Sequence, residues 1–146
     1  MSERSVLAKK LDDITSVIVR IRADWRCIKC GRRYEPIRSR FNGLPRQNML
    51  TTSHYWNRWR HSVRWDYANL DAMCKFCHDE VEHKKHEEVD GFNYENYMFE
   101  KLGQAEYERM MRRSEEVAFF TTSHLKMMLT ARRAEARRLN QNVRYF

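Results

Sequence analysis

Long apolar runs and unpaired cysteines are both missing from this chain of 146 residues, and proline and glycine are scarce. No run approaches the roughly 18 apolar residues that cross a bilayer, so we expect no membrane span. The chain starts with the charged stretch Met-Ser-Glu-Arg, so we expect no signal peptide. All four cysteines fall into two Cys-x-x-Cys pairs, which favours shared metal ligation over two disulfides. We therefore expect a cytoplasmic protein of a reducing compartment.

The formal charge of +8 is unevenly distributed along the chain. Acidic residues predominate between positions 79 and 108, whereas basic residues predominate before Lys75 and after Glu108. Basic flanks on both sides of a metal centre predict a polyanionic partner, with nucleic acid as the first candidate. For any single arginine, an ordinary solvated surface position is the alternative.

Apolar spacing predicts an α+β chain that is mostly helical. Leu7, Leu11, Ile14, Ile18 and Ile21 recur at helical spacing, so we expect a helix over about 5–23. The segment 36–48 holds both prolines and predicts a mobile loop. A strand is expected over 49–55, and a second short strand is expected to end near 65. Further helices are expected over 74–86, over 94–102 with Gly103 as C-cap, over 104–114 with Tyr107, Met110 and Met111 inward, and from Thr122 or Ser123 to about 139.

The cysteine spacing is the most specific pattern in the chain. Cys27 and Cys30 form the first pair, and Cys74 and Cys77 form the second. Four thiolates in this arrangement suit a closed tetrahedral site for a structural Zn²⁺ ion. His54 lies between the pairs.

Together these residues resemble the HNH, or ββα-metal, endonucleases, and most closely the phage recombination endonucleases of the NinG/Rap type. The resemblance covers about 27–112 and is carried by the cysteine pairs and by three short runs. These runs are Ser53-His54-Tyr55-Trp56-Asn57-Arg58, then Arg64-Trp65-Asp66 with Asn69, and Cys77-His78. The chain differs from the family at Ser53, where many HNH enzymes have a metal-binding Asp, and at His78, where NinG-type proteins commonly have Asn.

The resemblance implies a metal-dependent DNA endonuclease that hydrolyses phosphodiester bonds, with branched intermediates such as Holliday junctions as its substrate class. His54 would be the general base, Asn69 would hold the loop that carries it, and His78 would bind a catalytic Mg²⁺ or Mn²⁺ ion. Glu82, one helical turn after His78, is a candidate second ligand. A phage-encoded protein of this kind would act in the host cell cytoplasm.

This resemblance also implies an architecture: a zinc-stabilised ββα-metal core with flanking N- and C-terminal helices. We expect an N-terminal helix in 1–24, the zinc-bound nuclease core in 25–90, and a helical extension with a basic tail in 91–146. Two active sites would suit two DNA strands, so a homodimer built on the terminal helices is expected.

Arginines lie close to His54, the predicted general base, and recur along the C-terminal helix. The predicted DNA contacts are Arg58, Arg64, Arg132, Arg133 and Arg137. Trp56, Trp59 and Trp65 could stack on unpaired bases, with Trp59 expected to be the most exposed and Trp65 buried. Two alternatives stay open: a phage nicking or homing-like HNH enzyme, and a catalytically inactive zinc-stabilised DNA-binding protein.

Overall fold

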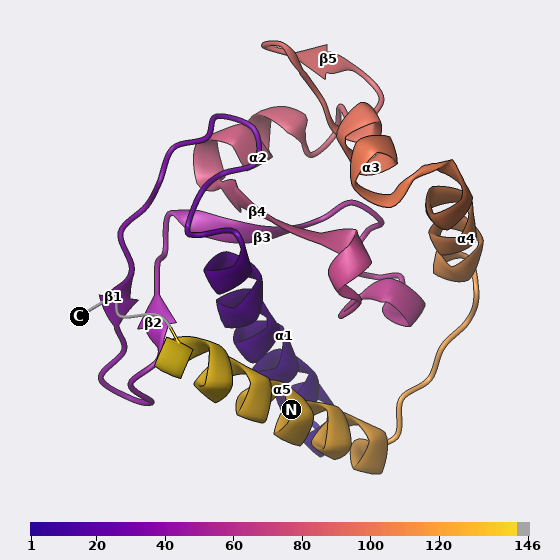
Figure 1. Ribbon diagram of the computed structural model, residues 1–146. Helices are drawn as coiled ribbons and strands as arrows, with labels where there is room; N and C mark the ends of the chain where they lie inside the picture. The colour runs from indigo at the N-terminus through magenta and orange to yellow at the C-terminus, as the bar shows by residue number, and fades with distance from the viewer. Residues whose placement is uncertain (143–146) are drawn as a thin grey trace.

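The computed structural model describes residues 1–142 and has an α+β architecture with helices in the majority (Figure 1). The helices are α1 Glu3–Arg22, α2 Lys75–Val81, α3 Tyr94–Leu102, α4 Gln104–Ser114 and α5 Thr122–Asn142. The strands are β1 Ile37–Arg38, β2 Pro45–Arg46, β3 Leu50–His54, β4 Leu70–Cys74, β5 Glu88–Val89 and β6 Phe92–Asn93. They pair as three antiparallel two-stranded sheets, β1 with β2, β3 with β4 and β5 with β6. The predicted α+β class is confirmed.

Helix α1 is the centre of the core and confirms the predicted N-terminal helix. The Ser2 hydroxyl caps it by accepting a hydrogen bond from the Ser5 amide. Its apolar side packs on α5 and on the β3–β4 sheet. Leu125 and Leu129 of α5 are buried in the same core. The apolar stripes of the two terminal helices are therefore used within the chain, and the homodimer remains a prediction.

Strands β3 and β4 lead directly into α2. His54 pairs with Leu70 at one end of the sheet, and Leu50 pairs with Cys74 at the other. Cys74 is also the N-cap residue of α2. The predicted second strand near residue 65 was wrong, because that part of the chain forms short 3₁₀ turns. The true partner strand is buried at every position and therefore lacks the alternation that marks a half-buried strand.

Two further segments differ from the predictions. The expected loop over 36–48 contains the β1–β2 hairpin. Helix α2 ends at Val81 rather than continuing to His86, and the chain then forms the β5–β6 hairpin. Asp90 and Gly91, with φ of 50° and 79°, make its tight turn, a conformation that favours these residue types.

The C-terminal part follows the predicted helices closely. Gly103 has φ of 76° and ends α3, as expected of a C-cap glycine. Thr121 caps α5, since its hydroxyl accepts a hydrogen bond from the His124 amide at 3.1 Å. Met111, predicted to point inward, is exposed on α4.

One hydrophobic core includes residues from all three predicted parts of the chain, 1–24, 25–90 and 91–146. The division itself stays a prediction. Among the described residues, no helix combines the length and the apolar character needed to cross a bilayer.

Candidate metal centre and histidine site

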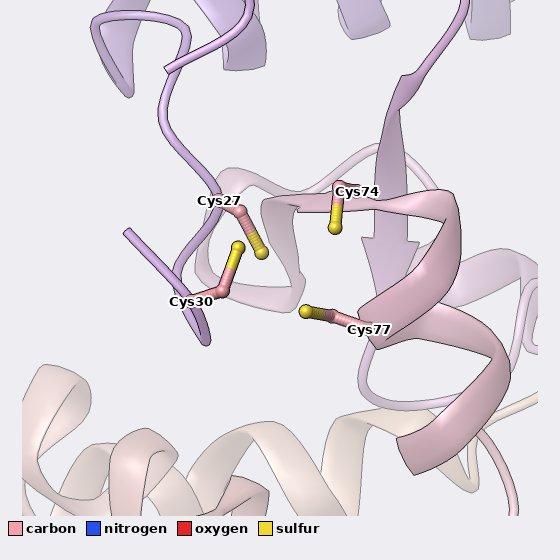
Figure 2. A group of neighbouring side chains, drawn as sticks. All are labelled: Cys27, Cys30, Cys74 and Cys77. Atoms are coloured by element: carbon pink, nitrogen blue, oxygen red, sulfur yellow. The ribbon is translucent and has the colours of Figure 1, made fainter. Parts of the chain in front are cut away.

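The four cysteines converge from two separate elements (Figure 2). Cys27 and Cys30 lie in the turn after α1, while Cys74 and Cys77 lie at the start of α2. Their four sulfur atoms are all within 4.8 Å of one another. In a tetrahedral zinc site with bonds of 2.3 Å, sulfur atoms are about 3.8 Å apart, so this cluster needs little adjustment to close on an ion. The four cysteines can hold a metal ion, as predicted.

Backbone hydrogen bonds hold the first cysteine pair in place. The Gly31 amide donates to the Cys27 carbonyl at 2.9 Å, and Gly31 has φ of 73° at the turn. The Ile28 amide donates to the Ala72 carbonyl of β4 at 3.0 Å, which docks this turn beside the second pair. The cluster therefore joins α1, β4 and α2.

The protonation chemistry of the thiols also suits a cation. Burial raises the pKa of Cys77, and the neighbouring thiols raise it further. Burial also raises the pKa of Cys74, but hydrogen bonds from Tyr34 and from the Cys77 backbone outweigh it and lower the value to about 7. Four thiolates this close repel one another unless a positive ion lies among them.

His54 lies at the end of β3 and lines a hollow of about 360 Å³ between this sheet and α1. Arg58 and Arg64 line the same hollow, as do Asp12 and Asp13 of α1. A side chain in this position is partly shielded by protein and still reaches solvent. His54 is therefore placed where a polar group of a ligand could meet it.

The imidazole of His54 is fixed by one hydrogen bond. Its Nε2 lies 3.1 Å from the backbone carbonyl oxygen of Arg64. Because a carbonyl oxygen only accepts, Nε2 carries the proton and Nδ1 keeps a free lone pair. Burial lowers the pKa of His54 to about 4, although this hydrogen bond and the nearby Asp12 carboxylate act in the opposite direction. At neutral pH the ring is therefore an uncharged proton acceptor.

Asn69 holds the loop that supplies this carbonyl. Its side chain is fully buried and its Oδ1 accepts from the Trp56 amide at 2.6 Å. Its Nδ2 donates to the carbonyl oxygens of Trp56 and Val63 at 2.9 and 3.1 Å. Val63 directly precedes Arg64, so Asn69 fixes the carbonyl that orients His54. The positioning role predicted for Asn69 agrees with these contacts.

Asp12 is a site residue that the sequence analysis missed. Its carboxylate accepts hydrogen bonds from Arg58 at 2.9 Å, from Arg64 at 3.0 and 2.6 Å, and from Trp65 Nε1 at 2.8 Å. Burial opposes ionisation of Asp12, but these partners outweigh it, so its pKa lies below the ordinary value. The only sequence signal was the charged pair Asp12-Asp13 inside an apolar stripe.

Two further contacts hold the end of β3. The Tyr94 hydroxyl donates to the Ser53 hydroxyl at 3.0 Å, so Ser53 points into the core. Lys85 donates to the carbonyl oxygens of His54 and Tyr55 at 3.2 and 2.6 Å. Lys85 thus anchors the end of β3, a role that no sequence pattern indicated.

His78 lies on α2, apart from the residues that line the hollow. Its Nδ1 is 3.9 Å from Glu82 Oε2 and 4.0 Å from Asp79 Oδ1. His78 and Glu82 share a helix face, as predicted, and both could contact one ion. Within residues 1–142, however, the cysteine cluster is the one close group of three or more metal-binding side chains, and His78 does not line the hollow that contains His54. A catalytic ion bound by His78 therefore stays a prediction.

The predicted DNA-binding arginines fall into two groups. Arg64 is only 12% exposed, with both of its bonds to Asp12, and Arg132 donates to the Trp65 carbonyl and lies over the Tyr67 ring. Arg58 is 57% exposed and uses one nitrogen on Asp12. Arg133 and Arg137 are exposed on α5. Arg58, Arg133 and Arg137 are therefore available to a ligand, whereas Arg64 and Arg132 hold the fold together.

Replacing Asn69 by Ala is expected to destabilise the protein by about 2–4 kcal/mol, since three buried backbone groups lose their partner. The measurement is urea unfolding followed by circular dichroism. Asn57→Ala is the matched control, because the Asn57 side chain is exposed and accepts a single bond from the Trp59 amide in the same loop. Equal losses in the two variants would remove the special role of Asn69.

Comparisons with protein-family models, curated proteins and solved structures found no significant match for this chain.

Proposed function

We propose that this protein is a DNA endonuclease of the HNH type, with His54 as the general base and zinc bound by the four cysteines. One observation carries the proposal most: Nε2 of His54 donates its proton to the Arg64 carbonyl, so Nδ1 is the proton acceptor of a ring that lines the hollow. A neutral imidazole held in this way can take a proton from water as the water attacks phosphorus.

The surrounding elements support the same proposal. β3, β4 and α2 follow one another in the order of a ββα unit, and Asn69 closes the loop between the strands. Zinc is the proposed ion because four thiolates select soft or borderline metals and favour a tetrahedral structural site. The zinc would join β4 and α2 to the turn after α1.

Arg58 is the proposed phosphate contact at His54. It lines the hollow, and its free nitrogens can bind a phosphate oxygen while one nitrogen stays on Asp12. Arg64 is better suited to positioning, because its guanidinium is bound to Asp12 and its carbonyl orients His54. Arg133 and Arg137 would add non-specific attraction to the DNA backbone.

A catalytically inactive, zinc-stabilised DNA-binding protein is the second candidate. It is favoured by Ser53, which packs against Tyr94, and by the separation of His78 from the hollow at His54. Mg²⁺ or Mn²⁺ at His78 and Glu82 remains a prediction of the family resemblance.

The test is a cleavage assay on Holliday junction, flap and linear duplex DNA. Purified zinc-loaded protein is incubated with Mg²⁺, with Mn²⁺, or with a chelator too weak to remove the zinc. We expect metal-dependent cutting of at least one substrate. Binding without cutting under all conditions would contradict the endonuclease and favour the second candidate.

A further inference from the structure

One stretch of the sequence is rich in arginine and contains no acidic residue, although Arg58 and Arg64 of this stretch pair with Asp12 of α1. Between Glu35 and Asp66 there is no Asp, Glu or Lys, and the stretch contains six arginines and two histidines. The arginines are Arg38, Arg40, Arg46, Arg58, Arg60 and Arg64. The same stretch presents the aromatic side chains of Phe41, 95% exposed, and Trp59, 81% exposed. Arginine and exposed aromatic rings are the side chains that bind phosphates and unpaired bases.

Phe41 lies at the tip of the β1–β2 hairpin, and the tip has a defined shape. The Ser39 amide donates to the Leu44 carbonyl at 2.8 Å, and the Gly43 amide donates back to the Ser39 carbonyl at 3.0 Å. Asn42 Oδ1 accepts from the Leu44 amide at 3.0 Å. These bonds fix the turn while leaving the Phe41 ring in solvent. An ordered turn limits the conformational entropy that a ligand would have to remove.

The base of the hairpin is fastened to α1. Arg20 of α1 donates to the carbonyl oxygens of Gln47 and Leu50, at 3.2 and 3.0 Å, just after β2. Leu44 and Pro45 of the hairpin are buried. The hairpin therefore stands in a fixed place beside α1, as Figure 1 shows at the lower left of the molecule.

Two hollows that share lining residues on α1 lie between this hairpin and His54. One hollow, of about 400 Å³, is lined by Asn42 and Arg46 of the hairpin region and by Asp13 and Ser16 of α1. Asp13 and Ser16 also line the hollow that contains His54. The two hollows thus meet on α1, and a flexible chain could pass from one to the other.

We infer that the β1–β2 hairpin binds single-stranded nucleic acid, with the Phe41 ring stacked on an unpaired base and with Arg40 and Arg46 on the neighbouring phosphates. The inference rests on the proposed function, since it adds a strand-binding element beside the proposed cleavage site. The occupant follows from two observations on the hairpin. Arg40 and Arg46 are exposed cations that attract a polyanion, and the exposed Phe41 ring offers a stacking surface to an unpaired base.

The experiment measures binding of the full-length, zinc-loaded protein to a labelled oligothymidine and to a linear duplex by fluorescence anisotropy, without added Mg²⁺ or Mn²⁺. Phe41→Ala is expected to weaken oligothymidine binding by about tenfold and duplex binding by less than about twofold. Phe41→Trp, which keeps a stacking ring, should stay within about twofold of the unchanged protein on both. Ile37→Ala is the matched control, because Ile37 is an exposed apolar residue of the same hairpin.

Three results would overturn the inference. Phe41→Ala could leave oligothymidine binding unchanged. It could also weaken binding to oligothymidine and to duplex DNA equally, which would show that the Phe41 ring does not select unpaired bases. It could also convert a dimer to a monomer in light scattering, which would make Phe41 a contact between two copies. The binding assay is separate from cleavage: ring-dependent binding by a protein that cuts no DNA would keep this inference and reject the endonuclease.

Discussion

Cys74→Ala is expected to abolish cooperative folding of the protein. Cys74 ends β4, occupies the N-cap position of α2 and contributes one of the four clustered sulfurs, so its loss opens the site that joins these elements to the turn after α1. Structural zinc contributes on the order of 10 kcal/mol or more in small domains, which equals or exceeds the whole stability of a typical domain. Circular dichroism should show lost helix, and elemental analysis should show lost zinc.

Met127→Ala is the control for this prediction, because Met127 is exposed on α5 and far in sequence from every cysteine. It should bind one zinc per chain and unfold like the unchanged protein. Removing zinc from the unchanged protein with a strong chelator should reproduce the Cys74→Ala result. A zinc-free Cys74→Ala protein that unfolds cooperatively at the usual urea concentration would contradict the structural role of the ion.

His54→Ala is expected to lower the cleavage rate by about 10²–10⁴-fold, the usual contribution of a general base. The substitution removes the imidazole that lines the hollow beside Arg58 and whose Nε2 is fixed on the Arg64 carbonyl. The cysteine cluster is formed by other elements, so zinc content should not change. DNA binding should stay within about threefold, because an uncharged ring adds little to phosphate affinity.

His61→Ala is the matched control for that experiment. His61 is exposed, lies in the same arginine-rich loop and lines neither the His54 hollow nor the cysteine cluster. It should cut DNA at nearly the unchanged rate. Equal loss in both variants, or normal cutting by His54→Ala, would remove His54 as the base.

The sequence was most informative where a local pattern carries the structure. The apolar stripe of α1 and the glycine after α3 predicted helix limits to within a few residues. The two cysteine pairs predicted a cluster that the fold brings together, because a pair spaced by two residues already places two sulfurs side by side. Trp59 and Trp65 were predicted exposed and buried respectively, and both predictions are confirmed.

Features that depend on distant parts of the chain were not predictable in this way. Asp12 binds Arg58 and Arg64, which lie about 50 positions later in the sequence, and no local pattern pairs these residues. β4 was missed because it is buried on both faces and is short. The hairpin at residues 37–46 was read as a loop, because prolines and a glycine mark turns without showing that the flanking residues pair.

The position of His78 shows a similar limit. Its place directly after Cys77 is local, but its distance from His54 depends on how α2 packs on the sheet. In Figure 1, α2 lies above β3 and β4, whereas α1, which forms the wall of the His54 hollow, lies below them. The order of residues along the chain does not show on which side of the sheet α2 packs, so it could not predict whether His78 lies near His54.

The most direct test of the central claim is the protonation state of the His54 ring, measured by proton–nitrogen NMR on nitrogen-15-labelled, zinc-loaded protein. Because the Arg64 carbonyl accepts from Nε2, the account predicts a proton on Nε2 and none on Nδ1 at neutral pH. Because burial lowers the pKa, the ring should stay neutral until the pH falls to about 4. A proton on Nδ1, or titration near the ordinary histidine value of 6.5, would contradict a proton acceptor aimed into the hollow.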